Sequence, residues 1–235
     1  MKNKLRLLLI LAFIASVNLF SESIDEIVAK MESKNGIDKY QKFKTVRLEA
    51  KQEVMGMSGA MNFFVKKPNK IRIDMDMQGK TIIQAFDGEK GWSVNPFMGT
   101  DTNELDKETS SQLQSQINIF GDRLINYKQL GITLSLVGVE SVDGTDCYKI
   151  KAVEKDQKEF TYFVDRSSYK TLQMKAKMQG PNGEMELTTN LKEYKDFSGV
   201  QIPTLMEIDA QMMTMKITFT KIEFDKNIDD SVFKR

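Results

Sequence analysis

The sequence predicts a mainly β protein of the α+β class, in which helices pack on the concave face of a single large curved antiparallel sheet. Three observations predict it. Apolar and polar residues alternate over most of the chain after residue 45, which is the period of strands with one face in water. Asp-Gly pairs, as at Asp87-Gly88 and Asp143-Gly144, separate the alternating segments and favour hairpin turns. Only about three short segments have helical spacing.

The chain begins with a segment typical of a secretory signal peptide. Three basic residues precede an apolar run over residues 7–20, and the small residues Ser21 and Ser23 follow it. The run is too short to span a bilayer comfortably, since a membrane helix needs about 20 apolar residues; an uncleaved anchor is the alternative. We therefore expect cleavage after Ser21 or Ser23, with residues 1–21 as the signal peptide and 22–235 as one exported domain.

The predicted helices lie in two regions. Residues 24–31 have helical spacing, carry two acidic residues in the first turn and are followed by Gly36, which together predict a short amphipathic helix. Residues 103–119 lack strand alternation and predict a helix that ends at Gly121. Residues 124–130 form a second short helical or irregular segment.

The predicted strands lie on either side of the second helical region. Before it they cover residues 46–54, 61–65, 71–77 and 81–86. After it they cover residues 133–142, 147–153, 159–164, 170–178, 185–194, 202–210 and 213–224. Short turns join most of them, so the sequence predicts a long antiparallel meander.

The most informative strand covers residues 71–77. Ile71, Ile73, Met75 and Met77 alternate there with charged residues, so one face of this strand is apolar and the other is in water. An apolar sheet face must be covered, either by a helix or by a ligand. The choice between those two covers decides the function.

Composition argues against enzymatic chemistry. The chain has no histidine, which excludes mechanisms with an imidazole base and removes the commonest zinc ligand. Asp74 and Asp76 alternate with apolar residues, so this carboxylate pair indicates a solvated strand face. We expect no enzyme, no catalytic residue, no metal and no cofactor; a hydrolase acting through Asp and Glu alone is the alternative.

Charge and cysteine content limit the partners and the source of stability. The formal net charge is +1, and removal of residues 1–21, which hold three basic and no acidic residues, lowers it to −2. This balance gives no electrostatic footprint for nucleic acid. Cys147 is the single cysteine and lies in an alternating run, so we expect a buried structural thiol and a fold stabilised by its hydrophobic core.

Several short motifs resemble one family. Residues 65–75 read V-K-K-P-N-K-I-R-I-D-M and residues 87–97 read D-G-E-K-G-W-S-V-N-P-F. Residues 136–144, 163–165, 194–203 and 228–233 read L-V-G-V-E-S-V-D-G, F-V-D, Y-K-D-F-S-G-V-Q-I-P and I-D-D-S-V-F. Together they resemble the periplasmic lipoprotein carrier LolA and the wider family of LolA-like outer-membrane lipoprotein-sorting proteins.

The resemblance implies a fold and a function. The fold would be an unclosed half-barrel of about eleven strands with a helical lid over its concave face. The function would be a monomeric periplasmic carrier that binds acyl chains of lipoproteins or related lipids in an apolar cavity and helps sort them to the outer membrane. Its partners would include an inner-membrane lipoprotein-releasing transporter and an outer-membrane acceptor. The alternative is a periplasmic sensor or regulatory domain of the same fold that binds a lipidated or envelope protein.

The resemblance also implies a lid latch. In the carrier, an arginine directly before the proline of this motif holds the lid, and an aromatic residue three positions after the proline faces the cavity. Those positions are Lys67 and Ile71 here. Lysine lacks the planar fork of arginine, so Lys67 is expected to hold the lid differently or to leave it more open at rest.

The expected lipid-binding residues are apolar and many are methionines. Methionine is flexible and suits surfaces that accept variable apolar partners, although it also fills irregular cores, and Trp92 could instead pack against the first helix. The expected set is Phe63, Ile71, Ile73, Met75, Met77, Trp92, Phe97, Met174, Met178, Met206 and Met215.

Overall fold

One antiparallel sheet of thirteen strands forms the body of the described chain. The computed structural model describes residues 22–99, 101–120, 123–180, 183–210 and 213–235. The predicted signal peptide over residues 1–21 and the predicted helix stop at Gly121 therefore lie outside the described residues. Every described strand pair is antiparallel, as the alternation and the turns predict.

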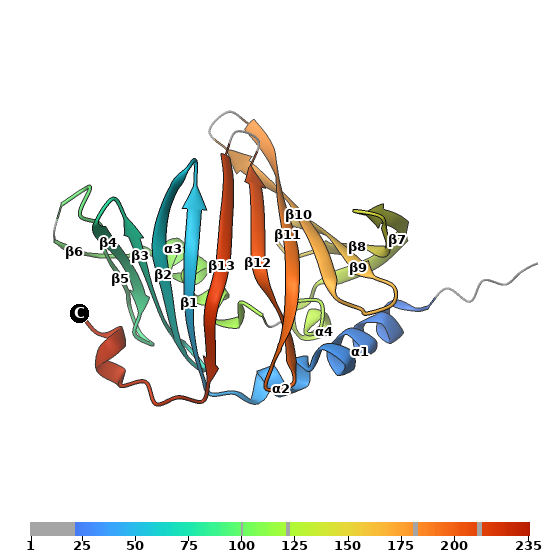
Figure 1. The fold of residues 1–235 in the computed structure, drawn as a ribbon, viewed down its shortest axis with the longest axis horizontal. Coiled ribbons are helices and arrows are strands. Elements are labelled where there is room, and N and C mark those ends of the chain that lie inside the picture. The colour runs from blue at the N-terminus through green and yellow to red at the C-terminus, as the bar shows by residue number, and fades with distance from the viewer. Residues whose placement is uncertain (1–21, 100, 121–122, 181–182, 211–212) are drawn as a thin grey trace, which may run out of the picture.

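The strand order shows two meanders that meet in the middle of the sheet. The order is β6-β5-β4-β3-β2-β1-β13-β12-β11-β10-β9-β8-β7. In chain order the strands are β1 (Thr45–Val54), β2 (Met57–Lys66), β3 (Lys70–Met77), β4 (Lys80–Phe86), β5 (Gly91–Val94), β6 (Thr102–Glu104), β7 (Thr133–Val142), β8 (Thr145–Val153), β9 (Glu159–Asp165), β10 (Thr171–Gly180), β11 (Gly183–Phe197), β12 (Val200–Ala210) and β13 (Met213–Phe224). The edge strands β6 and β7 do not pair with each other, so the curved sheet is an unclosed half-barrel (Figure 1).

The strand count exceeds the expected eleven because of β5 and β6. Residues 102–104 pair with β5, so the predicted helix over 103–119 begins later, at α3 (Lys107–Ser115), and continues as the 3-10 turn η1 (Gln116–Asn118). Asp106 caps α3, because its side chain accepts a hydrogen bond from the Thr109 amide. The turn at Asp143 and Gly144 has positive φ at both residues, 47° and 81°, as the Asp-Gly pair predicts for a tight hairpin.

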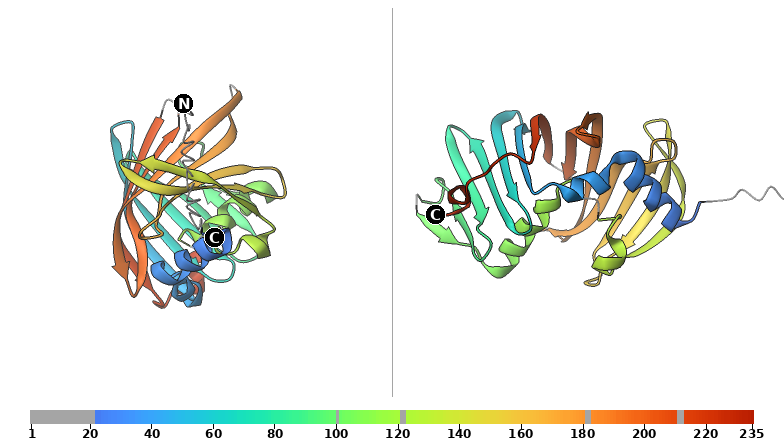
Figure 2. Two further views of the ribbon diagram at one scale, coloured as in Figure 1. Left: turned by 90° about the vertical axis from the view of Figure 1, so that its right-hand side faces the viewer. Right: turned by 90° about the horizontal axis from the view of Figure 1, so that it is seen from below.

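Two consecutive helices close one end of the half-barrel. Helix α1 (Ile24–Asn35) begins with a capping box between Ser23 and Glu26 and ends at Gly36. The predicted helix over 24–31 is therefore correct in type and one turn too short. A second helix, α2 (Ile37–Lys42), follows directly and was not predicted. Both helices lie across the lower end of the sheet (Figure 2).

Opposite faces of β2–β5 carry different elements. Helix α3 lies on the concave face, where Leu113 packs with Ile71. The C-terminal segment, residues 226–235 with the short turn η2 (Asp230–Phe233), lies on the other face of the same strands (Figure 2).

A short helix, α4 (Tyr127–Leu130), precedes β7. Among the described residues, no helix is both long enough and apolar enough to cross a bilayer.

Candidate ligand cavity

The concave side of the half-barrel holds a cavity of about 300 Å³. The end of α1, the segment after α3, and the strands β9–β12 enclose it. Its lining residues are Met31, Asn35, Ile37, Ser115, Gln116, Asn118, Ile119, Phe120, Arg123, Tyr162, Tyr169, Lys170, Thr171, Met174, Thr189, Leu191, Tyr194, Gln201, Pro203 and Met206. Its volume is at the lower end of the range of about 300–1,000 Å³ that small-molecule sites occupy.

The cavity lies where two hydrophobic clusters meet. The larger cluster packs β1–β3, β12 and β13 against α2 and α3, and Phe120 and Met206 belong to its edge. The smaller cluster packs α1 and Leu124 against β8–β10, and Met31 and Met174 belong to it. Because members of both clusters line the cavity, it is a space between the two cores.

Polar groups of the lining are fixed by hydrogen bonds to the backbone. The Asn35 amide nitrogen donates to the Met31 carbonyl at 3.1 Å and to the Tyr169 carbonyl at 2.8 Å. The second of these bonds joins the end of α1 to the β9–β10 turn. The Tyr194 hydroxyl donates to the Thr171 carbonyl at 2.6 Å, so β11 is tied to the start of β10. Burial raises the pKa of the Tyr169 phenol, which also bonds to Glu22.

Lys67 contacts the second helix directly. Its ammonium donates to the Tyr40 carbonyl at 2.9 Å and to the Gln41 carbonyl at 3.4 Å. It also lies 4.4 Å from the centre of the Tyr40 ring. Burial lowers the pKa of the Lys67 ammonium. A lysine thus reaches the C-terminal end of α2, where the helix dipole favours a cation.

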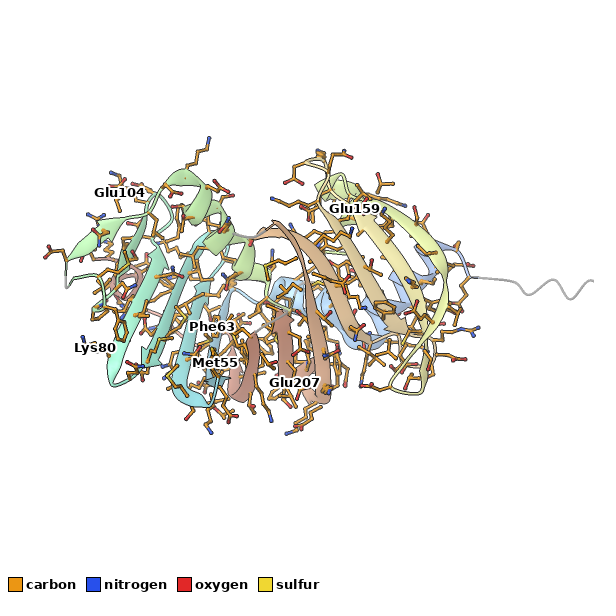
Figure 3. The ribbon with its side chains drawn as sticks, turned by 90° about the horizontal axis from the view of Figure 1, so that it is seen from above. Met55, Phe63, Lys80, Glu104, Glu159 and Glu207 are labelled. Atoms are coloured by element: carbon orange, nitrogen blue, oxygen red, sulfur yellow. The ribbon has the colours of Figure 1, made fainter. Side chains whose placement is uncertain are left out.

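The lining includes two of the expected lipid-binding residues. Met174 on β10 and Met206 on β12 face the cavity. Three others, Phe63, Ile71 and Ile73, are fully packed in the larger cluster, and Figure 3 shows Phe63 on the inner side of the curved sheet.

The other four expected methionines are not among the described residues that line the cavity. Met75 and Met215 are partly buried and pack against its edge. Met77 is partly buried near the end of β3. The side chain of Met178 lies outside the described part of the chain.

Trp92 and Phe97 lie away from the cavity. The Trp92 indole nitrogen donates to the Phe233 carbonyl at 2.8 Å, so Trp92 is buried beneath the C-terminal segment and not against the first helix. Phe97 is exposed in the loop after β5, with the Lys80 ammonium 5.0 Å from its ring centre.

Much of the lining was not predicted. Tyr162, Tyr169, Tyr194 and Leu191 come from β9, β11 and the β9–β10 turn, whereas most of the expected lipid-binding residues lie on β2–β5. The alternation along β11 places Thr189 and Leu191 on one face, and this signal could have found them.

The described residues offer binding chemistry. They contain no group of three or more His, Cys, Asp or Glu side chains placed to hold a metal ion. Cys147 is buried, as its alternating run predicts, and burial raises the pKa of its thiol. An apolar hollow with hydroxyl, amide and cationic groups in its wall can hold an amphiphile.

Several solved structures are similar to this one in fold. A DUF1329 family protein from Desulfovibrio piger is 15% identical, with a TM-score of 0.63, over 88% of this chain and 97% of that chain. A LolA superfamily protein from Nitrosomonas europaea is 12% identical, with a TM-score of 0.60, over 92% of this chain and 99% of that chain. A third structure is a domain from Vibrio parahaemolyticus that is named as an outer membrane lipoprotein-sorting protein. It is 10% identical, with a TM-score of 0.62, over 90% of this chain and 97% of that chain.

The half-barrel and its helices are thus LolA-like in fold. Residues 93–235 match the model of a family described as "Uncharacterized protein", and the chain belongs to that family. No protein of curated function matches the sequence.

Proposed function

We propose that this protein is a periplasmic carrier that binds an acyl chain of lipoproteins or related lipids. The observation that supports it best is the apolar cavity of about 300 Å³ between the two cores, next to the helices α1 and α2. The predicted signal peptide over residues 1–21 would direct the chain to the periplasm, and the domain over 22–235 would act there. A lipoprotein-releasing transporter of the inner membrane would load it, and an outer-membrane acceptor would unload it.

Burial of the acyl chain supplies enough free energy to hold the ligand. Each buried methylene contributes roughly 0.8 kcal/mol, so a long acyl chain supplies about 10 kcal/mol before the costs of binding. Met31, Met174 and Met206 supply polarisable side chains that adapt to a chain of variable shape. No catalytic group is required to hold such a ligand.

The helices α1 and α2 would act as the lid, with Lys67 as its latch. Lys67 holds the end of α2, and the end of α1 forms one wall of the cavity. A lysine can leave the carbonyls of Tyr40 and Gln41 without breaking a bidentate pair. Movement of the helices would therefore widen the cavity and admit the acyl chain.

The test is to purify the protein from the cell envelope and to identify any bound lipid by native mass spectrometry. Leu191→Trp places a bulky ring at the cavity wall and is expected to remove the bound lipid. Val137→Trp is the matched control, because Val137 is exposed on β7 and does not line the cavity. Ile71 is unsuited to this test, since it is fully buried and a polar substitution there would unfold the core.

The outcomes separate clearly. Lipid in the wild type and in Val137→Trp, and its loss in folded Leu191→Trp, would support the carrier. Lipid-free wild-type protein, or equal lipid in all three forms, would contradict it.

A sensor that binds an envelope protein is the second candidate. It is favoured by the edge strand β7, which has no partner on one side among the described strands and exposes Val137 and Val139. Such an edge can pair with an extended segment of another chain. A stable protein complex that survives removal of lipid would favour the sensor over the carrier.

A further inference from the structure

The charges of the cavity wall have one sign. Two cationic residues, Arg123 and Lys170, line the cavity, and no Asp or Glu is among its described lining residues. The chain as a whole has 34 basic and 33 acidic residues, so the charge balance of this lining differs from that of the chain. A wall with cations and without carboxylates favours a ligand that carries negative charge.

Lys170 is held by an aromatic ring. Its ammonium lies 5.1 Å from the centre of the Tyr194 ring, and the Tyr194 hydroxyl is fixed to the Thr171 carbonyl at 2.6 Å. Among the described ion pairs within 4.0 Å, none joins Lys170 to a carboxylate. The ring positions the ammonium without neutralising it, so its charge is available to an anion.

Arg123 differs in this respect. Its guanidinium lies 2.8 Å from a carboxylate oxygen of Glu154 and 5.3 Å from the centre of the Phe160 ring. Its charge is already balanced by Glu154, which does not line the cavity. Lys170 is therefore the better anchor for an anion, and Thr171 and Gln201 in the same lining supply neutral hydrogen-bonding groups.

We propose that the ligand of this cavity is a single-chain amphiphile with an anionic carboxylate or phosphate head group. The inference rests on the proposed function and specifies its ligand. The hydrocarbon chain lies between Met31, Met174 and Met206, and the head group contacts the Lys170 ammonium. A volume of about 300 Å³ favours one chain over several.

The experiment measures binding to the protein after delipidation, with three probes that share one saturated acyl chain. Hexadecanoate carries a carboxylate, lysophosphatidylglycerol carries a phosphate, and monopalmitoylglycerol is neutral. The better of the two anionic probes is expected to bind about fivefold to tenfold more tightly than the neutral probe, as one charge-assisted contact provides. The difference should shrink as salt rises, because Lys170 is partly exposed.

Variants assign the preference to one residue. Lys170→Met is expected to remove the difference between anionic and neutral probes, and Lys170→Arg to keep it. Lys195→Met is the control, since Lys195 is exposed on β11 and does not line the cavity. Circular dichroism checks that each variant is folded.

Each result decides between the two proposals. Equal affinity of the wild type for anionic and neutral probes, or an intact preference in folded Lys170→Met, overturns the anionic ligand and leaves the carrier standing. Failure of the wild type to bind any of the three probes overturns both.

Discussion

Gly36 joins α1 to α2 at a position that only glycine fits. Its φ is 66°, in the left-handed region. A Cβ atom there would lie 1.9 Å from the carbonyl oxygen of Gly199, in the turn between β11 and β12. The missing side chain therefore lets the two helices rest on the sheet beside the cavity.

Gly36→Ala is expected to lower the free energy of unfolding by about 2–4 kcal/mol. About 1 kcal/mol comes from the left-handed backbone, and about 1–3 kcal/mol from overpacking against Gly199. Urea denaturation measures it. Gly144→Ala is the control, because Gly144 also has a positive φ but faces open space, and we expect a loss of about 1 kcal/mol. Equal losses in the two variants would refute the close approach.

Lys67→Met is expected to loosen α2. The substitution removes two hydrogen bonds to the carbonyls of Tyr40 and Gln41, and one such bond contributes about 1 kcal/mol, which is about a fivefold change in an opening equilibrium. Hydrogen exchange of the α2 amides should therefore accelerate by about fivefold or more. Lys67→Arg can still donate to these carbonyls and should exchange close to the wild-type rate. Unchanged exchange in Lys67→Met would mean that packing alone holds the helix.

Ion pairs help to hold the C-terminal segment on the sheet. Asp230 accepts hydrogen bonds from the ammonium groups of Lys66 at 2.6 Å and Lys70 at 2.8 Å. These bonds lower the pKa of the Asp230 carboxyl from 3.8 to about 2. The Trp92 indole bonds to the same segment at Phe233. Ion pairs, a buried aromatic contact and backbone bonds thus fix the segment on the outer face of β2–β5.

The stabilisation by Asp230 should disappear in acid. The pKa is lower in the folded state than in the unfolded state, so the contribution is complete above about pH 4 and is lost as the pH falls towards about 2. Wild type should have a higher urea midpoint than Asp230→Asn above pH 4, and the two midpoints should converge near pH 2. Emission from Trp92, the single tryptophan, reports the transition. A midpoint difference that persists at pH 2 would contradict this assignment.

The elements differ in how well the sequence predicts them. Strands such as β7 and β13 have the predicted bounds, because apolar and polar residues alternate along them and this alternation is visible locally. The sequence does not predict helix α2, since Gly36 is a signal for the end of a helix and here also precedes the next one. Strand β6 has three exposed residues and no alternation of burial, and only its pairing with β5 defines it.

The sequence predicts the cavity lining less well than the strands, because the lining depends on how distant segments pack together. Met174 and Met206 were expected in it from strand faces and methionine content. Ile71 and Phe63 belong to the larger cluster, where Leu113 of α3 packs near Ile71 and the Phe219 ring packs near Phe63. Nothing in the alternation distinguishes a strand face covered by the protein itself from one covered by a ligand. Lys170 and Tyr194 meet through the antiparallel pairing of β10 with β11, but the end of α1 that completes the cavity wall is distant in the sequence, and a sequence period does not encode that contact.

At the scale of the whole molecule, the cavity separates two cores that share one sheet. The larger cluster holds β1–β3 and β13, the smaller one holds α1 and β8–β10, and both contribute residues to the cavity wall. An acyl chain in this space would touch both cores at once. Ligand binding should therefore stabilise the domain as one unit.

An anionic single-chain amphiphile is accordingly expected to raise the melting temperature of the delipidated protein. A ligand that binds the folded state alone, at about 100 times its Kd, adds about 2.7 kcal/mol. For a domain of this size, 1 kcal/mol raises the melting temperature by about 2–4 °C, so the expected rise is about 5–10 °C. Differential scanning calorimetry with lysophosphatidylglycerol below its micelle concentration measures it, and Val137→Trp should respond as the wild type does. Leu191→Trp, whose ring reduces the space between the cores, should show little or no rise. A rise of equal size in Leu191→Trp would place the bound amphiphile elsewhere on the protein, because only a ligand in the cavity is displaced by that ring.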